Sequence, residues 1–147
     1  MIIQLTDWLY QGNWESVRDA EYTQFPIGAI ICVNENNERV HPLPGNDVNY
    51  LWCSFNDPGE TLDGAKLDVM RFFARAFKYK GVLVHCYGGA NRSSAICAFL
   101  LATIDFPYSP SSSCQIVRQK NPFMGIREEL EQRIFSLTGF RIGNPRE

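Results

Sequence analysis

Two short apolar runs constrain the fold of this chain more than any other feature of its sequence. Residues 27–33 (IGAIICV) lie between Pro26 and Asn34, and residues 82–85 (VLVH) follow Gly81. Both runs lack the polar alternation of a strand with one solvated face, so they predict strands that are buried on both faces of a sheet. Such strands are typical of parallel sheets that are covered by helices.

The segments around these runs alternate between strand and helix patterns. Residues 61–80 have the clearest helical period, with one apolar stripe and Thr61 as the expected N-cap. This order predicts a single α/β domain over residues 1–147, with a central, mostly parallel sheet flanked by helices on both faces. The other predicted elements are strands at 2–5, 8–10 and 48–53 and helices at 13–24, 92–103, 110–120 and 126–137.

The composition restricts the classes of protein to which the chain can belong. A length of 147 residues, with 45% hydrophobic and 20% charged residues, fits one globular domain and excludes disorder, collagen and coiled coil. No apolar run is long enough for a bilayer and no basic segment precedes the apolar N-terminus, so we expect neither a membrane span nor a secretory signal. Five cysteines without a CxxC pair predict free thiols in the cytoplasm or, in a eukaryote, also the nucleus.

Charge is distributed unevenly along the chain. Residues 1–60 carry nine acidic and two basic side chains, whereas residues 61–147 carry seven acidic and twelve basic ones, so the two parts have net charges of −7 and +5. The net charge of the whole chain is −2, which argues against nucleic acid as a partner. The uneven distribution is explained either by solvated surfaces of opposite sign or by attraction of an anionic substrate to the basic part.

The segment 82–94 (VLVHCYGGANRSS) contains the residues with the clearest chemical meaning. A predicted buried strand ends at His85 and Cys86, a glycine-containing loop follows, and Arg92 and Ser93 open an apolar helix. Backbone N–H groups of such a loop, together with the positive end of the helix, form a site for an anion. The Arg92 guanidinium can bind two phosphate oxygens at once, and the same positive field favours the thiolate form of Cys86. The loop therefore predicts a phosphate site with a nucleophile at its base.

Each of these residues also has an ordinary structural explanation. A cysteine after a buried strand is usually a small core residue, a lone histidine there is usually structural, and a Gly-Gly pair is usually a turn. The combination of His85, Cys86, Arg92 and Ser93 at this spacing, between a strand and a helix, is much harder to explain in that way. We therefore interpret the segment as a catalytic loop.

This His-Cys-x5-Arg-Ser motif resembles the signature of the cysteine-dependent protein phosphatases, and the chain is similar to their compact dual-specificity branch. The similarity begins near residues 9–12 (LYQG), continues through 27–33 and reaches the helix at 126–137. It implies a metal-independent hydrolase, without a cofactor, that acts on phosphotyrosine and on phosphoserine or phosphothreonine in proteins. Phosphate, sulfate and vanadate are the implied anionic ligands, and we expect a monomer.

The resemblance also implies a role for each residue of the loop. Cys86 is the nucleophile that forms a phosphocysteine intermediate, and Ser93 donates a hydrogen bond that helps the sulfur to leave. His85 supports the loop without touching the substrate. Charge on the phosphoryl oxygens is stabilised by the Arg92 side chain and by the backbone N–H groups of the phosphate-binding residues, which are Tyr87, Gly88, Gly89, Ala90, Asn91 and Arg92.

The general acid of this mechanism is an aspartate on a separate loop upstream of the cysteine. Asp57, in the sequence SFNDPG, lies 29 residues before Cys86, between a predicted strand and a predicted helix, and it matches this position. Asp-Pro-Gly is also an ordinary turn sequence. The competing candidates are Asp63 and Asp68, which we expect on the solvated face of the helix that follows, and Glu60.

Two departures from the family pattern affect the expected activity. The loop has no lysine, which argues against a highly charged inositol phosphate as substrate. Family members often have an asparagine near the start of the last helix that helps to position water, and residues 122–125 (PFMG) contain none. We therefore expect slow hydrolysis of the intermediate.

Other functions are compatible with parts of the sequence. Asn91-Arg92 is similar to the loop of the related RNA 5′-triphosphatases, which use the same phosphate site. A pseudoenzyme that holds phosphoproteins without cleaving them is a second alternative, and the intact Cys86, Arg92 and Ser93 argue against it. A rhodanese-like sulfurtransferase is opposed by the same argument, because it has no need of the complete loop.

Cys32 is a candidate redox partner of Cys86. The strand that contains Cys32 and the strand before Cys86 would end side by side in a parallel sheet, about 5 Å apart, which is within disulfide range. Some phosphoinositide phosphatases of the superfamily have a resolving cysteine in a similar strand. The alternative is that Cys32 is a small core residue.

Overall fold

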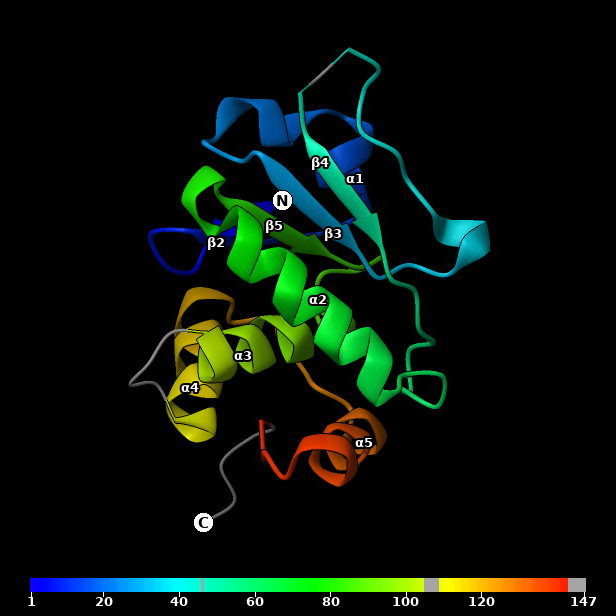
Figure 1. Ribbon diagram of the computed structural model, residues 1–147, viewed down its shortest axis with the longest axis vertical. Coiled ribbons are helices and arrows are strands. Elements are labelled where there is room, and N and C mark those ends of the chain that lie inside the picture. The colour runs from blue at the N-terminus through cyan, green and yellow to red at the C-terminus, as the bar shows by residue number, and fades with distance from the viewer. Residues whose placement is uncertain (46, 105–108, 143–147) are drawn as a thin grey trace.

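A five-stranded sheet forms the centre of the computed structural model, which describes residues 1–45, 47–104 and 109–142 (Figure 1). Its strands are β1 (Ile2–Gln4), β2 (Leu9–Gly12), β3 (Ala29–Cys32), β4 (Asn49–Trp52) and β5 (Val82–His85). They lie in the order β1-β2-β5-β3-β4, with β1 antiparallel to β2 and the other neighbours parallel. The predicted mostly parallel sheet is confirmed, and β5 lies at its centre.

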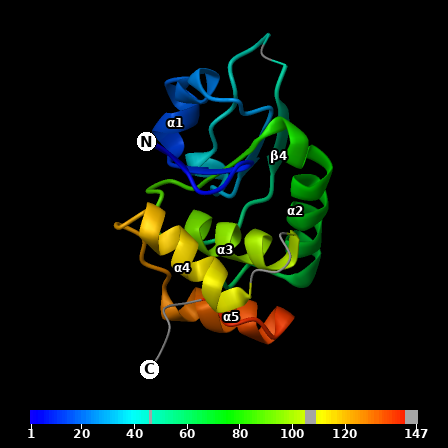
Figure 2. The same cartoon turned by 90° about the vertical axis from the view of Figure 1, so that its left-hand side faces the viewer.

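Helices cover the two faces of the sheet unequally. The α-helices are α1 (Trp14–Arg18), α2 (Gly64–Phe77), α3 (Arg92–Ile104), α4 (Pro110–Lys120) and α5 (Glu128–Thr138), and the 3-10 turns are η1 (Glu21–Gln24), η2 (Asn36–Glu38) and η3 (Lys78–Lys80). In Figure 1, α2 crosses in front of the sheet and α1 lies behind it. Figure 2 shows α3, α4 and α5 stacked below the strands. The second face therefore carries only short helical segments.

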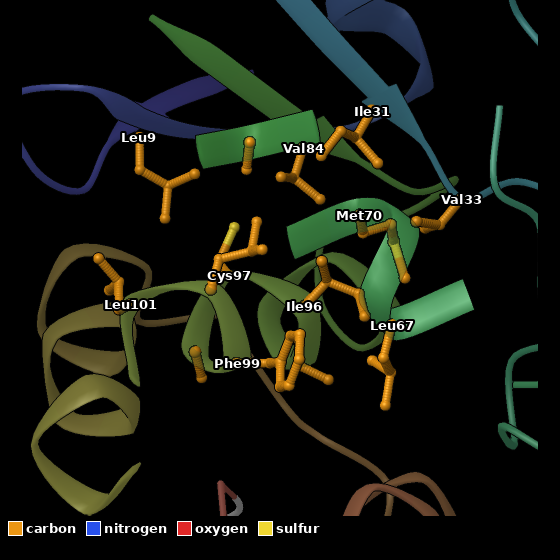
Figure 3. Close-up of a cluster of buried hydrophobic side chains, with 14 of the residues drawn as sticks. Leu9, Ile31, Val33, Leu67, Met70, Val84, Ile96, Cys97, Phe99 and Leu101 are labelled. Carbon is orange, nitrogen blue, oxygen red and sulfur yellow. The ribbon is translucent and has the colours of Figure 1, made fainter. Parts of the chain in front are cut away.

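Two hydrophobic cores correspond to these two faces. The larger core joins the sheet to α2, α3, α4 and α5, and Figure 3 shows part of it, with Ile31 and Val84 of the sheet opposite Met70, Ile96 and Cys97. The smaller core joins the other face of the sheet to α1 and η1, through Tyr10, Ile30, Leu83, Val17 and Tyr22. Alternate residues of β3 and β5 are thus buried on opposite faces, as expected for strands without a solvated face.

The helix predicted at 13–24 is interrupted in the structure. Asn13 caps α1, and its side chain accepts a hydrogen bond from the Ser16 N–H group. α1 ends at Arg18, and Ala20 adopts a left-handed conformation with φ 58° before η1 begins. This conformation ends the helical hydrogen-bond pattern, so one predicted helix becomes two short segments.

The start of α2 also differs from the prediction. Asp63, not Thr61, is the N-cap, because its side chain accepts from the Lys66 N–H group at 2.8 Å. Thr61 instead exchanges hydrogen bonds with Asn56: the Asn56 N–H donates to Thr61 Oγ1 at 2.8 Å and the Thr61 N–H donates to Asn56 Oδ1 at 3.1 Å. These bonds close the loop that contains Asp57.

Gly81 sets the point at which β5 enters the sheet. Its φ is 86°, and a Cβ atom there would overlap the carbonyl oxygen of Pro26. The Gly81 carbonyl accepts from the N–H groups of Gly28 and Ala29, at 3.0 and 3.1 Å, and the next residues pair Ala29 with Val82. Glycine is required here because no other residue combines this conformation with such a close approach.

Candidate active site

The loop that was predicted to be catalytic lies at the carboxyl end of the central strand. β5 ends at His85, residues 86–91 form the loop, and α3 begins at Arg92. The N-terminus of α3 therefore points at the loop, where its unpaired N–H groups and its dipole favour an anion. Cys86 is only 2% exposed and contributes to the larger core.

Two hydrogen-bonding groups contact the sulfur of Cys86. The Gly89 N–H group donates to Sγ at 3.1 Å, and the Ser93 hydroxyl oxygen lies 3.2 Å from it. Both contacts are buried. The hydroxyl can accept from a thiol, and it can donate to a sulfur that carries no proton.

Gly89 is the glycine that the loop requires. Its φ is 77°, and a Cβ atom there would lie 2.6 Å from the Met1 side chain and 3.3 Å from the Gly12 carbonyl oxygen. Gly88, which the sequence grouped with it, has an ordinary φ and open space around the position of a Cβ atom. Only one of the two glycines is therefore needed for the backbone conformation.

The Arg92 side chain is buried and held from two other segments. Its NH1 group donates to the Phe55 carbonyl oxygen and its NH2 group to Glu38 Oε1, both at 3.2 Å. The guanidinium is 5% exposed, so it lies inside the site rather than at the surface. These contacts orient the planar guanidinium before any anion is bound.

Asp57 is brought to the loop by three groups. Asn91 Nδ2 donates to Asp57 Oδ1 at 2.9 Å and to the Asp57 carbonyl oxygen at 2.7 Å. Arg127 NH1 donates to Asp57 Oδ2 at 3.1 Å, and Arg92 Nε lies 3.5 Å from Oδ1. Arg127 also donates its backbone N–H to Asn91 Oδ1 at 2.7 Å. The structure thus places Asp57 beside the catalytic loop, 29 residues upstream.

The competing acidic residues lie elsewhere. Asp63 caps α2, and Asp68 forms an exposed ion pair of 3.5 Å with Arg71. Glu60 is exposed. Of the four candidates, Asp57 is the one that contacts both the loop, through Asn91, and Arg92.

The Tyr87 side chain points away from the loop interior. It is 47% exposed and stacks on Trp14, with ring centroids 5.4 Å apart and planes within 5°. The Trp14 N–H group donates to the Tyr87 carbonyl oxygen at 3.2 Å, and Arg18 lies over the Trp14 ring at 3.9 Å. The Tyr87 ring therefore forms part of the surface beside the loop.

His85 is fully buried beneath the loop. Its Nδ1 atom lies 3.4 Å from the Cys86 carbonyl oxygen, and its Nε2 atom has no hydrogen-bond partner among the described residues. Burial, with a smaller contribution from the charge of Arg92, lowers the pKa of His85 to about 4. The imidazole is therefore neutral at physiological pH, and it contacts the backbone of the loop at Cys86.

The proposed redox pairing of Cys32 with Cys86 is wrong for this structure. Cys32 pairs in register with His85, so its side chain lies on the face of the sheet opposite that of Cys86. Burial raises the pKa of the Cys32 thiol, which hydrogen-bonds Tyr50. The residues that share the core of Cys86 include Cys97, whose thiol pKa is raised by burial and then by the charge of Cys86. All five cysteines are free.

Sequence reasoning missed several side chains that support the loop. Gln11, Asn121 and Ser94 are fully buried and form hydrogen bonds behind it, and Arg127 pairs with Asp57. A polar residue directly after the apolar Leu9-Tyr10 pair of a predicted strand is a weak signal that could have identified Gln11. The others come from distant segments, and no local pattern distinguishes them.

The described residues offer no metal centre and no membrane-spanning helix. Nowhere in residues 1–45, 47–104 and 109–142 do three or more His, Cys, Asp or Glu side chains come together in a way that could hold a metal ion. Within the same ranges, every helix is too short or too polar to cross a bilayer.

Comparisons with known proteins agree with this geometry at the level of fold. No family model matches the sequence, and no curated protein matches it significantly. Among solved structures, human DUSP28 aligns with a TM-score of 0.80 at 17% identity, over 94% of this chain and 93% of that one. A mouse putative dual specificity phosphatase complexed with zinc tungstate aligns at 0.79 and 19%, over 94% and 86%. PTPMT1 in complex with PI(5)P aligns at 0.71 and 16%, over 92% and 93%.

The chain therefore has the fold of the dual-specificity phosphatases. The predicted fold class is confirmed, because these neighbours cover nearly the whole chain with the same α/β architecture. At these identities the likeness concerns the fold, and the activity has to be argued from the site itself.

Proposed function

We propose that this protein is a metal-independent protein phosphatase that hydrolyses phosphotyrosine, phosphoserine and phosphothreonine through a phosphocysteine intermediate. The proposal rests on the hydrogen-bonding and charged groups that surround the Cys86 sulfur. It lies at the N-terminus of α3, within 3.2 Å of the Gly89 N–H and the Ser93 hydroxyl, in a loop that ends at the buried Arg92. A phosphoryl dianion is the ligand that suits this combination of charge and donors.

In the first step, the Cys86 thiolate attacks phosphorus while the bond from phosphorus to the ester oxygen breaks. Asp57 gives its proton to that oxygen, which leaves as the free hydroxyl of the tyrosine, serine or threonine. Arg92 and the loop N–H groups stabilise the charge on the three phosphoryl oxygens.

In the second step, water attacks phosphorus and gives a proton to Asp57, while the bond from phosphorus to sulfur breaks. Inorganic phosphate leaves, and Cys86 returns to its thiolate form. The Ser93 hydroxyl stabilises the departing sulfur, which it already contacts in the structure.

A nucleophile variant tests the proposal directly. Cys86→Ser should lose hydrolysis of phosphopeptides and still bind vanadate or tungstate, because the loop N–H groups and Arg92 are unchanged. Rapid acid quenching of the wild type with a ³²P-labelled phosphopeptide should trap label on Cys86. Hydrolysis by Cys86→Ser above trace level, or label on another residue, would contradict the proposal.

A substrate panel distinguishes the alternatives. It contains phosphotyrosine and phosphothreonine peptides, a phosphoinositide and RNA with a 5′-triphosphate. We expect turnover of both peptides by a monomer, with a moderate preference for phosphotyrosine. Release of phosphate from the RNA alone would indicate a 5′-triphosphatase, and binding of peptides without turnover would indicate a pseudoenzyme.

A further inference from the structure

Two buried amide side chains lie directly behind the catalytic loop. Gln11 belongs to β2, and Asn121 is the C-cap of α4, 110 residues later. Both are fully buried, and both contact the Gly89 carbonyl oxygen of the loop. Apolar residues would fill these positions without the cost of burying amides, so the polar groups need an explanation.

The orientation of the Asn121 amide is fixed by the backbone of its neighbour. The Phe123 N–H group donates to Asn121 Oδ1 at 3.1 Å, so this atom must be the acceptor. The Nδ2 group then points the other way and donates to the Gly89 carbonyl at 3.0 Å and to Gln11 Oε1 at 3.2 Å.

The Gln11 amide is oriented in turn. Because its Oε1 atom accepts from Asn121, its Nε2 group faces the start of α3. There it donates to Ser94 Oγ at 2.7 Å and to Ser93 Oγ at 3.0 Å, and it also reaches the Gly89 carbonyl at 3.1 Å.

The Ser93 hydroxyl is the last member of this chain of bonds. A hydroxyl has one hydrogen and two lone pairs, and one of the lone pairs accepts from the Gln11 amide. Once Cys86 is a thiolate, its sulfur at 3.2 Å can only accept, so the Ser93 hydrogen is available to it. The same amides hold the Gly89 carbonyl, on the residue whose N–H donates to that sulfur at 3.1 Å.

We propose that Gln11 and Asn121 are positioning residues that aim two hydrogen-bond donors, the Ser93 hydroxyl and the Gly89 N–H, at the sulfur of Cys86. Neither amide touches the substrate. Their effect is to stabilise Cys86 as a thiolate, both as nucleophile and as leaving group. This inference rests on the proposed function for its catalytic meaning, but its effect on the thiol can be measured without turnover.

The test is the pH dependence of Cys86 alkylation by iodoacetamide, followed by mass spectrometry of the Cys86 peptide. Gln11→Met keeps the volume of the side chain and removes its amide. The midpoint of alkylation should rise by about one pH unit, the size expected when an ionised group loses a hydrogen bond. Tyr10→Phe, on the same strand but in the smaller core, is the matched control and should leave the midpoint unchanged.

A double-mutant cycle separates orientation from general disruption. Ser93→Ala should raise the midpoint by a similar amount, and Gln11→Met in the Ser93→Ala background should add less than it does in the wild type, because only the Gly89 carbonyl is then left for Gln11 to hold. In phosphatase assays, the single variants should also slow hydrolysis of the phosphoenzyme about tenfold, with less effect on KM.

Several results would overturn the inference. One is an unchanged alkylation midpoint in a folded Gln11→Met variant, and another is full additivity with Ser93→Ala. If circular dichroism shows that Gln11→Met is unfolded, Asn121→Leu at the end of α4 is tested in its place. The expected shift of the alkylation midpoint is the same, and an unchanged midpoint in folded Asn121→Leu would also overturn the inference. A wild type without phosphatase activity would refute the proposed function while leaving the alkylation result to decide this inference.

Discussion

At the residue scale, the Asp57 carboxylate is the group whose surroundings most determine the chemistry of the site. Arg127 reaches one of its oxygens at 3.1 Å, and Asn91 reaches the other at 2.9 Å. Asn91 also accepts from the Arg127 N–H group, so loop, aspartate and the start of α5 are joined by one set of bonds. The Asn91 side chain therefore holds Asp57, the proposed general acid, against the loop.

Replacing the acid should have an effect that depends on the leaving group. Asp57→Asn should lower kcat by about 10²–10⁴-fold for phosphoserine or phosphothreonine peptides, the usual range for loss of a general acid. An activated aryl phosphate, whose oxygen leaves without a proton, should be affected much less in the first step. Steady-state kinetics on both substrates measures the difference.

Asp63→Asn is the matched control, because Asp63 caps α2 and asparagine is also a good N-cap. The assignment would fail if Asp63→Asn, and not Asp57→Asn, showed the dependence on the leaving group.

His85 should make the stability of the protein depend on pH. Its pKa is about 4 in the folded protein and near 6.5 when unfolded, so the unfolded state binds the proton more strongly. Neutral His85 therefore contributes about 3 kcal/mol to the free energy of unfolding. This contribution is fully present above pH 6.5 and is lost as the pH falls towards 4. Urea unfolding of the wild type and His85→Gln at several pH values measures this contribution. The stability difference between the two proteins should shrink as pH falls, and a difference that stays constant would show that His85 is not buried as a neutral base.

At the element scale, the active site depends on how β5 enters and leaves the sheet. Gly81 starts the strand in register with β3, and the loop after His85 leads directly into α3. The Asn56–Thr61 bonds and the Asp63 cap hold the neighbouring segment, which carries Asp57. Each of these connections is tight, so a strained substitution in one of them should affect the whole site.

Gly81→Ala should destabilise the protein by more than the usual cost of a left-handed alanine, which is on the order of 1–3 kcal/mol. The added Cβ atom would also overlap the Pro26 carbonyl, and this carbonyl belongs to the backbone. Gly139→Ala is the control for a positive φ without overlap: Gly139 is in the αL region, with φ 79° and ψ 1° and nothing within 4 Å of the added atom, whereas Gly81 has ψ 128°. Chemical denaturation compares the two free energies of unfolding, and an equal loss in both variants would contradict the importance of the overlap.

At the scale of the whole molecule, segments from both ends of the chain meet at the loop. Gln11 from β2, Asp57 from the loop before α2, Asn121 from α4 and Arg127 at the start of α5 all contact it or one another. The charges that meet there are those of two arginines, Arg92 and Arg127, and of two carboxylates, Asp57 and Glu38. In the proposed mechanism, the Arg92 guanidinium and the backbone N–H groups of the loop bind the phosphoryl group without a metal ion.

Chelation should accordingly leave the activity unchanged. Excess EDTA, followed by dialysis, should alter neither kcat nor KM on a phosphotyrosine peptide, because the described part of the chain brings no three potential metal ligands together. The measurement is a steady-state assay before and after treatment. Inactivation by EDTA that a divalent cation reverses would contradict the mechanism.

The sequence by itself determined the features that depend on neighbouring residues. The runs at 27–33 and 82–85 predicted buried parallel strands, and the segment 82–94 predicted the strand, the loop and the helix that follow one another there. The positions of Cys86 and Arg92 follow from that local order. Asp57 was selected through the family resemblance, which expects an acid between a strand and a helix upstream of the cysteine, because Asp-Pro-Gly by itself is an ordinary turn sequence.

Only the tertiary structure decided the relations between distant segments. The register of β3 against β5 puts Cys32 opposite His85, and a shift of one residue would have put it on the face of Cys86. The meeting of Gln11 with Asn121 depends on the packing of α4 beneath the loop, across 110 residues of chain. Such contacts carry no local signal, because a buried glutamine or asparagine is specified by the partner that satisfies it, and that partner is chosen by the fold.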